Sequence, residues 1–153
     1  MGKGVPASLL MTLLRGMLRA EVLSGLPPDR ILHDLNQLAQ EDLAQSHRFV
    51  TLFYSDFDPR TRLLRYANAA HNPPLIWRRQ RNSVERLDAP GLLIGLQPEA
   101  SYGCEQIVLE PGDVLLCYTD GVTEASGLNG ERFDEGRLVN DLQQACRSGV
   151  GAQ

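Results

Sequence analysis

The chain has 153 residues, of which 42% are hydrophobic and 22% are charged, and its formal net charge is -4. This length and composition are typical of one globular domain with a hydrophobic core. The negative charge gives no reason to expect nucleic acid or a membrane as a partner, and no apolar run approaches the roughly 20 residues that span a bilayer. The 3 cysteines lack metal-ligand spacing, which predicts reduced thiols and a cytoplasmic protein.

Residues 5–46 contain two helical patterns. Apolar side chains recur at three- and four-residue intervals, as at Leu10, Leu14 and Met17 in the first pattern. Gly25 and the two prolines that follow it predict the end of the first helix and the start of the second. We expect these apolar stripes to pack in the core or against a partner helix, and not to bind a cofactor.

Residues 48–119 have the alternation and turn signals of a sheet region. Residues 49–57 and 63–69 are predicted to form one hairpin, residues 75–79 and 83–87 a second, and residues 102–109 a further strand. Residues 114–118 are expected to form a buried strand that carries Cys117 as a small hydrophobic side chain. A last helix is predicted at about residues 134–147, with Asp134 as its cap. Helices segregated from a run of antiparallel strands indicate the α+β class.

Asp120 lies two residues beyond the end of the predicted strand at residues 114–118, within the segment Thr119-Asp120-Gly121. A carboxylate just beyond a stiff strand is well placed to bind a metal ion or a reacting group, and Gly121 allows a sharp turn. An ordinary Asp-Gly turn also explains the dipeptide, and such turns are the more common case. Both interpretations stay open on this segment alone.

Two other segments have chemical potential. Gly2-Lys3-Gly4, ahead of the first helix, could hold a phosphate group on backbone N–H groups, although the P-loop pattern is absent. His71 lies between two strands and could act as an acid or base, but such a histidine more often fixes a turn. The acids that follow Asp120 have no metal-loop spacing, so we expect them to cap or solvate the last helix.

Five segments along the chain resemble one family. They are residues 2–7 (Gly-Lys-Gly-Val-Pro-Ala), 49–54 (Phe-Val-Thr-Leu-Phe-Tyr), 66–74 (Tyr-Ala-Asn-Ala-Ala-His-Asn-Pro-Pro), 92–95 (Leu-Leu-Ile-Gly) and 110–125, which includes Thr-Asp-Gly. Together they are similar to motifs of the SpoIIE/RsbU-type phosphatases, bacterial members of the PPM class that resemble protein phosphatase 2C. A single such match would be weak, but five in family order are specific.

The resemblance implies an antiparallel β-sandwich flanked by helices, present here as a partial PPM-type phosphatase domain over residues 1–153. It implies hydrolysis of phosphoserine or phosphothreonine on a regulatory protein, such as a STAS-type anti-sigma-factor antagonist, with two Mn²⁺ or Mg²⁺ ions. Asp120 would be a metal ligand, and no side chain is assigned as catalytic. The supporting motif positions would be Gly2, Lys3, Gly4, Thr119, Gly121, His71 and Asn72. The two leading helices would contact a regulatory domain or form a homodimer.

The departures from the family pattern matter as well. The family's first metal-binding aspartate would fall just ahead of Met1, and its final Asp-Asp pair would fall after residue 153, so we expect this chain to be a fragment. Ala70 replaces a glycine of the family pattern, a change expected to tighten the turn before His71. Two alternatives to an active phosphatase follow: a non-catalytic interaction module and an inactive gene remnant of the family.

Overall fold

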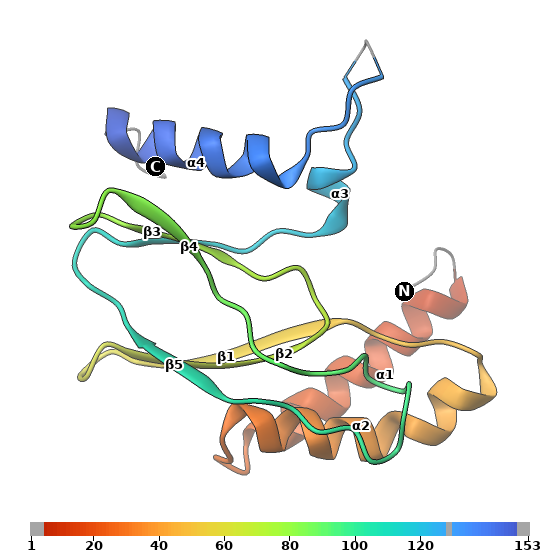
Figure 1. Ribbon diagram of the computed structural model, residues 1–153. Helices are drawn as coiled ribbons and strands as arrows, with labels where there is room; N and C mark the ends of the chain where they lie inside the picture. Colours follow the sequence, from red (N-terminus) through yellow and green to blue (C-terminus); the bar gives the residue numbers. More distant parts are fainter. Residues whose placement is uncertain (1–4, 128–129, 150–153) are drawn as a thin grey trace. The chain divides into compact units, whose positions relative to one another are not determined.

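The protein is described by a computed structural model, which covers residues 5–127 and 130–149 (Figure 1). The chain divides into two units. The first unit holds residues 5–71 and 89–108, and the second holds residues 72–88, 109–127 and 130–149. Each unit contains one three-stranded antiparallel sheet and at least one helix that packs with it. The predicted α+β class with antiparallel strands is therefore confirmed.

The first unit begins with two helices, α1 (Val5–Val22) and α2 (Pro28–Gln45), as the apolar periodicity predicted. Pro28 occupies the first turn of α2. Backbone N–H groups in the first turn have no partner within the helix, so the N–H that proline lacks is not needed there. The sheet of this unit has the order β1-β2-β5, formed by β1 (Leu52–Asp58), β2 (Leu63–Ala69) and β5 (Glu105–Val108). The predicted hairpin is the β1–β2 pair, with Leu52 opposite Ala69.

The core of the first unit lies between the helices and this sheet. Helix α2 packs on β2 and β1, and α1 packs on α2. The buried side chains come from both helices, from β2 and from the segments that precede β1 and β5. They include Leu10, Leu14, Leu32, Leu35, Leu43, Val50, Ala67 and Ile94. Leu10 and Leu14 of α1 and most of the α2 stripe are therefore core residues, in agreement with the sequence prediction. Other apolar positions of the same two patterns are exposed, namely Leu9, Leu13, Val22 and Leu38.

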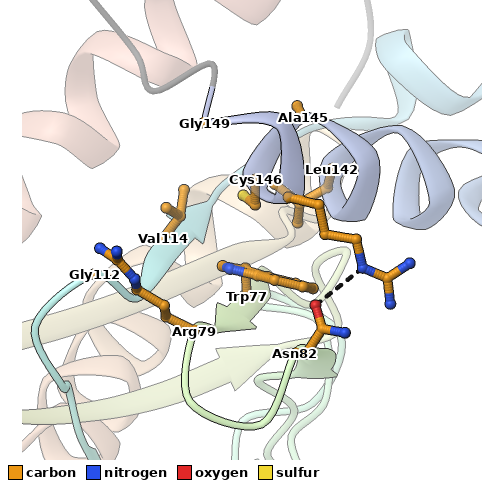
Figure 2. A pocket seen from close by; sticks show the side chains of 10 residues that line it. Trp77, Arg79, Asn82, Gly112, Val114, Leu142, Ala145, Cys146 and Gly149 are labelled. Carbon is orange, nitrogen blue, oxygen red and sulfur yellow. Dashed lines mark hydrogen bonds between the residues drawn. The ribbon is translucent and has the colours of Figure 1, made fainter.

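The second unit has the sheet order β4-β3-β6, formed by β3 (Leu75–Arg78), β4 (Ser83–Arg86) and β6 (Val114–Leu116). The β3–β4 pair is the second predicted hairpin, with Leu75 opposite Arg86. Helix α4 (Glu135–Ser148) packs on both of these strands. Near the end of α4, the Nε of Arg147 donates a hydrogen bond of 2.9 Å to Oδ1 of Asn82 in the hairpin turn (Figure 2).

Helix α4 begins one residue later than predicted, and its cap is the predicted one. The Asp134 carboxylate accepts a hydrogen bond of 2.9 Å from the backbone N–H of Arg137, which satisfies a donor that the first helical turn leaves free. The helix ends at Gly149, whose φ of 75° is in the left-handed region where glycine is favoured.

The prediction of a buried strand at residues 114–118 was wrong in two respects. The strand β6 covers Val114–Leu116 only, and it lies at the edge of its sheet, paired with β3 alone among the described residues. Val114 is 40% exposed and Cys117 is exposed, whereas Tyr118 is 7% exposed and joins the core beneath α4. An apolar run indicates burial only where both faces of the strand are covered, and the exposure of Val114 and Cys117 shows that this segment is not covered along its whole length.

Among the described residues, no helix has both the length and the apolar character needed to cross a membrane.

Candidate functional site

Asp120 is the first residue of the short helix α3 (Asp120–Thr123), four residues after β6 ends. The backbone carbonyl of Asp120 accepts a hydrogen bond of 2.8 Å from the N–H of Glu124, which closes this helical turn. The residue is exposed, and no described residue makes a hydrogen bond or ion pair with its carboxylate. A solvent-facing, unpaired acid at a fixed position in the backbone can serve as a ligand.

Gly121 does not form the sharp turn that the sequence predicted. It continues the helix that Asp120 begins, and it is absent from the residues with positive φ. A Cβ added at Gly121 would lie 3.6 Å from Oγ1 of Thr119, which is an ordinary van der Waals contact. The described structure therefore gives no local steric reason for a glycine at this position.

The described acids do not by themselves fit a two-ion centre. Among these residues no group of three or more His, Cys, Asp or Glu side chains could hold a metal ion. Three of the acids that follow Asp120 have structural partners instead. Glu131 pairs with Arg137 at 2.6 Å, Glu135 pairs with Arg86 at 3.2 Å, and Asp134 caps α4.

His71 lies in a turn that is held by Asn68. The Asn68 side chain accepts a hydrogen bond of 2.8 Å from the His71 N–H and donates one of 2.9 Å to the His71 carbonyl. Asn68 is only 2% exposed, so its buried amide holds the His71 turn rigidly near the end of β2. The His71 ring is oriented separately, by a 3.0 Å hydrogen bond between its Nδ1 and Oγ1 of Thr51. The acid–base role of His71 stays a prediction.

Sequence reasoning missed Asn68, although a signal was present. An asparagine near the end of a strand, three residues before the segment His-Asn-Pro-Pro, is typical of a side chain that forms hydrogen bonds with the backbone of a nearby turn. Of the other motif positions, Asn72 is partly buried in the second unit, and Gly2, Lys3 and Gly4 lie outside the described residues.

Ala70 has a φ of 51°, in the left-handed region that costs an L-residue about 1–2 kcal/mol. We expect Ala70→Gly to raise the free energy of unfolding by up to about 1 kcal/mol, because relief of this strain exceeds the added entropy of the unfolded chain. Urea denaturation measures the change. The neighbouring Ala69→Gly is the control: Ala69 is a buried strand residue without positive φ, so the same substitution should destabilise the protein. Destabilisation by both variants to the same extent would contradict the assignment of strain to Ala70.

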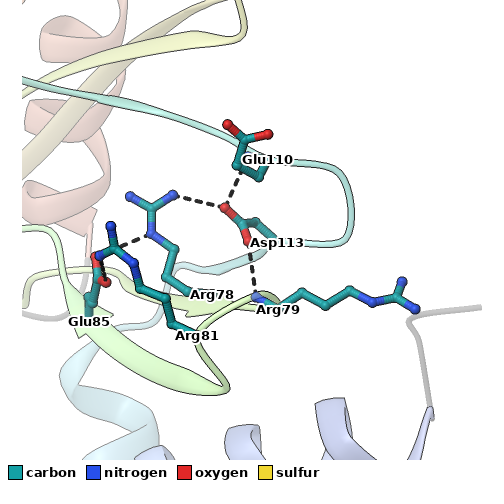
Figure 3. A network of polar contacts seen from close by, with 6 residues as sticks. All are labelled: Arg78, Arg79, Arg81, Glu85, Glu110 and Asp113. Atoms are coloured by element: carbon teal, nitrogen blue, oxygen red, sulfur yellow. Dashed lines mark hydrogen bonds and ion pairs between the residues drawn. The ribbon is translucent and has the colours of Figure 1, made fainter.

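A buried ion-pair network positions the chain that enters β6 (Figure 3). The Asp113 side chain, 3% exposed, accepts hydrogen bonds from Nη1 of Arg78 (2.8 Å), from the Glu110 N–H (3.0 Å) and from the Arg79 N–H (3.1 Å). Arg78 also pairs with Glu85 across the β3–β4 hairpin at 3.2 Å. The network thus ties the turn before β6 to the hairpin beside it, and the sequence analysis assigned no structural role to Asp113.

The contacts within this network shift the pKa values of Asp113 and Arg78. Burial raises the pKa of Asp113, but the Glu110 N–H, the Arg78 guanidinium and the Arg79 N–H outweigh it, and the net pKa lies below its ordinary value. Burial lowers the pKa of Arg78, and its hydrogen bonds to Asp113 and Glu85 more than compensate, so its pKa is raised. Both groups are therefore held in their charged forms near neutral pH.

Comparison with known proteins identifies the family. The Stage II sporulation protein E (SpoIIE) family profile matches residues 1–152. Phosphoserine phosphatase RsbU of Bacillus subtilis is 31% identical over 142 residues, which are 92% of this chain and 42% of that protein. The chain therefore spans less than half the length of this relative.

Two solved structures share the fold. The RsbU and RsbW domains of a Mycobacterium tuberculosis protein match with a TM-score of 0.80 and 23% identity, covering 97% of this chain and 40% of that one. The SiaA-PP2C domain of Pseudomonas aeruginosa matches with a TM-score of 0.80 and 24% identity, covering 95% of this chain and 58% of that one. From the match over nearly its whole length, and from the fold, this chain belongs to the SpoIIE family of PPM-type phosphatase domains.

Proposed function

We propose that this chain is part of a metal-dependent protein phosphatase that hydrolyses phosphoserine or phosphothreonine, and that Asp120 is one of its metal ligands. The observation that carries the proposal is the position of Asp120: its exposed, unpaired carboxylate begins α3 just beyond β6, within the Thr-Asp-Gly motif. A relative that aligns over 92% of this chain is a phosphoserine phosphatase. Carboxylates are the ligands that Mg²⁺ and Mn²⁺ prefer.

The ions would be Mn²⁺ or Mg²⁺, and when bound they would supply an activated water and neutralise phosphoryl charge. Because the described residues contain no cluster that could hold a metal ion, we propose that further ligands come from a longer protein of which this chain is a part. The coverage of only 58% of the SiaA-PP2C domain chain supports this proposal. The substrate would be a cytoplasmic regulatory phosphoprotein, such as a STAS-type anti-sigma-factor antagonist.

The test is hydrolysis of a phosphoserine peptide by the natural protein that contains this chain, followed as release of inorganic phosphate with Mn²⁺. We expect Asp120→Asn to lower kcat/KM by at least about 100-fold, because a charged group that holds the catalytic ions is lost. Asp141→Asn, which removes the same charge from an exposed position on α4, should leave kcat/KM within about twofold. Equal activity of Asp120→Asn and the wild type would contradict the assignment.

A second candidate function is that of a non-catalytic interaction module that binds a regulatory domain or a second copy. One face of α1 favours it. Leu9 and Leu13 are 68% and 42% exposed, and with Gly16 and Ala20 they follow the spacing of a helix–helix seam. Nothing lies within 4 Å of a Cβ added at Gly16, so a partner helix could approach closely there. Mn²⁺-dependent hydrolysis of a phosphopeptide by the purified chain would exclude this function.

A further inference from the structure

The second unit contains a hollow between the C-terminal half of α4 and the strands β3 and β6 (Figure 2). Its volume is about 640 Å³, within the roughly 300–1,000 Å³ that is usual for small-molecule sites. None of its lining residues belongs to the Thr119-Asp120-Gly121 segment. A role for this hollow is therefore separate from the proposed phosphatase chemistry.

The walls of the hollow are largely apolar. Trp77, on β3, is 4% exposed, so only a small part of its indole ring borders the hollow, opposite the apolar side chains that α4 contributes (Figure 2). Leu142 and Ala145 lie on α4, and Val114 extends the apolar wall from β6. Contact with such a wall favours a ligand that has an apolar part.

Two arginines, Arg79 and Arg147, line the hollow. The guanidinium carbon of Arg147 lies 6.0 Å from the Trp77 ring centroid, at the range of a cation–π contact, and its Nε is fixed by Asn82. Its remaining N–H donors form no ion pair with a described residue.

The Arg79 guanidinium has fewer contacts than that of Arg147. The backbone N–H of Arg79 bonds Asp113, but its guanidinium makes no hydrogen bond or ion pair with a described residue. Its side-chain stem lies across Gly112, where a Cβ would come within 2.3 Å of the Arg79 Cδ. Gly112 therefore makes room for Arg79 at the rim. No lining residue among those described is acidic, so both positive charges stay uncompensated in a protein of net charge -4.

We propose that this hollow binds a small organic anion, in which an apolar body carries a carboxylate, phosphate or sulfonate group. The body lies along the α4 side chains and the exposed part of Trp77, and the anionic group accepts hydrogen bonds from Arg79 or from Arg147. Charge-assisted hydrogen bonds from guanidinium groups to such anions are among the stronger polar contacts in proteins. The volume of the hollow favours a small molecule over an acidic peptide.

Trp77 is the single tryptophan of the chain, so its fluorescence reports directly on the hollow. The experiment titrates the 153-residue chain with anilinonaphthalene sulfonate and follows quenching of Trp77. We expect saturable one-to-one binding that is about tenfold weaker or more in the Arg79→Gln/Arg147→Gln double variant. The uncharged dye phenylnaphthylamine, which has the same ring system, should bind more weakly by a similar factor. Arg60→Gln removes the same charge from a side chain that is 91% exposed in the first unit, and should not change binding.

Three results would overturn the proposal: no saturable quenching, equal affinity for the charged and uncharged dyes, or equal weakening by Arg60→Gln. Far-UV circular dichroism checks that the double variant is folded. If it is not, Arg79→Gln alone decides, since its guanidinium holds no described residue in place. A change of Trp77 emission on dilution without dye would show that a second copy of the chain fills the hollow, which also overturns the assignment to a small molecule.

Discussion

Replacing Asn36 with alanine is expected to lower the free energy of unfolding by about 3 kcal/mol. Asn36 is 0% exposed on α2, and its amide makes three hydrogen bonds to the segment that follows Ile94. Its Nδ2 donates to the carbonyls of Gln97 (2.9 Å) and Pro98 (3.1 Å), and its Oδ1 accepts from the N–H of Gly95 (2.8 Å). Alanine would leave the Gly95 N–H without its partner, would remove one of the two donors that the Gln97 and Pro98 carbonyls now have, and would open a small cavity beside α2.

Thermal unfolding followed by circular dichroism measures this effect as a fall in Tm of about 6–12 °C, since 1 kcal/mol corresponds to about 2–4 °C at this size. Gln37→Ala is the matched control. Gln37 is the next residue of α2 and also donates to the Pro98 carbonyl, but it is exposed, so water replaces its hydrogen bond. We expect a loss below about 1 kcal/mol for this control. An equal fall in Tm for both variants would refute the role of burial at Asn36.

Replacing Asp113 with asparagine is expected to cost about 2–4 kcal/mol at pH 7, the second large effect. Asparagine keeps the shape of the side chain but removes the charge opposite Arg78, whose side chain is only 13% exposed. It also offers one acceptor oxygen where Asp113 now accepts from Arg78, Arg79 and Glu110. Urea denaturation at pH 7 measures the loss. Asp141→Asn, at an exposed position on α4, should change stability by less than about 0.5 kcal/mol.

The same pair of proteins should differ in pH dependence. Because the folded-state pKa of Asp113 is lowered, its contribution is fully present above its unfolded pKa of about 4, and is lost as the pH falls through the lower folded value. The stability gap between the wild type and Asp113→Asn should therefore be widest near pH 7 and should narrow below about pH 4. A gap of the same size at pH 7 and pH 3 would show that Asp113 contributes through its shape and not through its charge.

Local sequence signals predicted the helices and hairpins well, because each depends on neighbours within a few residues. The cap of α4 at Asp134 and the β3–β4 hairpin are examples. The extent and burial of β6 could not be predicted, because whether a strand lies at the centre or the edge of a sheet depends on pairing with distant segments. For the same reason Asn36 was missed, since its partners are about 60 residues away in the sequence.

The candidate site, too, could be predicted from the sequence only in part. The Thr-Asp-Gly motif indicated Asp120 from the sequence, and the structure places it exposed and unpaired at the start of α3. What the motif could not show is which side chains surround Asp120, and the described residues place no cluster of metal ligands anywhere. Asp113, only seven residues earlier, lies in the same matching segment, and the sequence did not show that its side chain is buried against Arg78.

We propose that Asp120 belongs to a phosphatase metal centre whose other ligands are not among the described residues of this chain. The most direct measurement is Mn²⁺-dependent release of phosphate from a phosphoserine peptide by the 153-residue chain alone, over a range of Mn²⁺ concentrations. We expect no release above the Mn²⁺ blank, because one carboxylate gives little affinity for a pair of ions. Hydrolysis that saturates at micromolar Mn²⁺ and disappears in Asp120→Asn would show instead that this chain holds a complete metal centre.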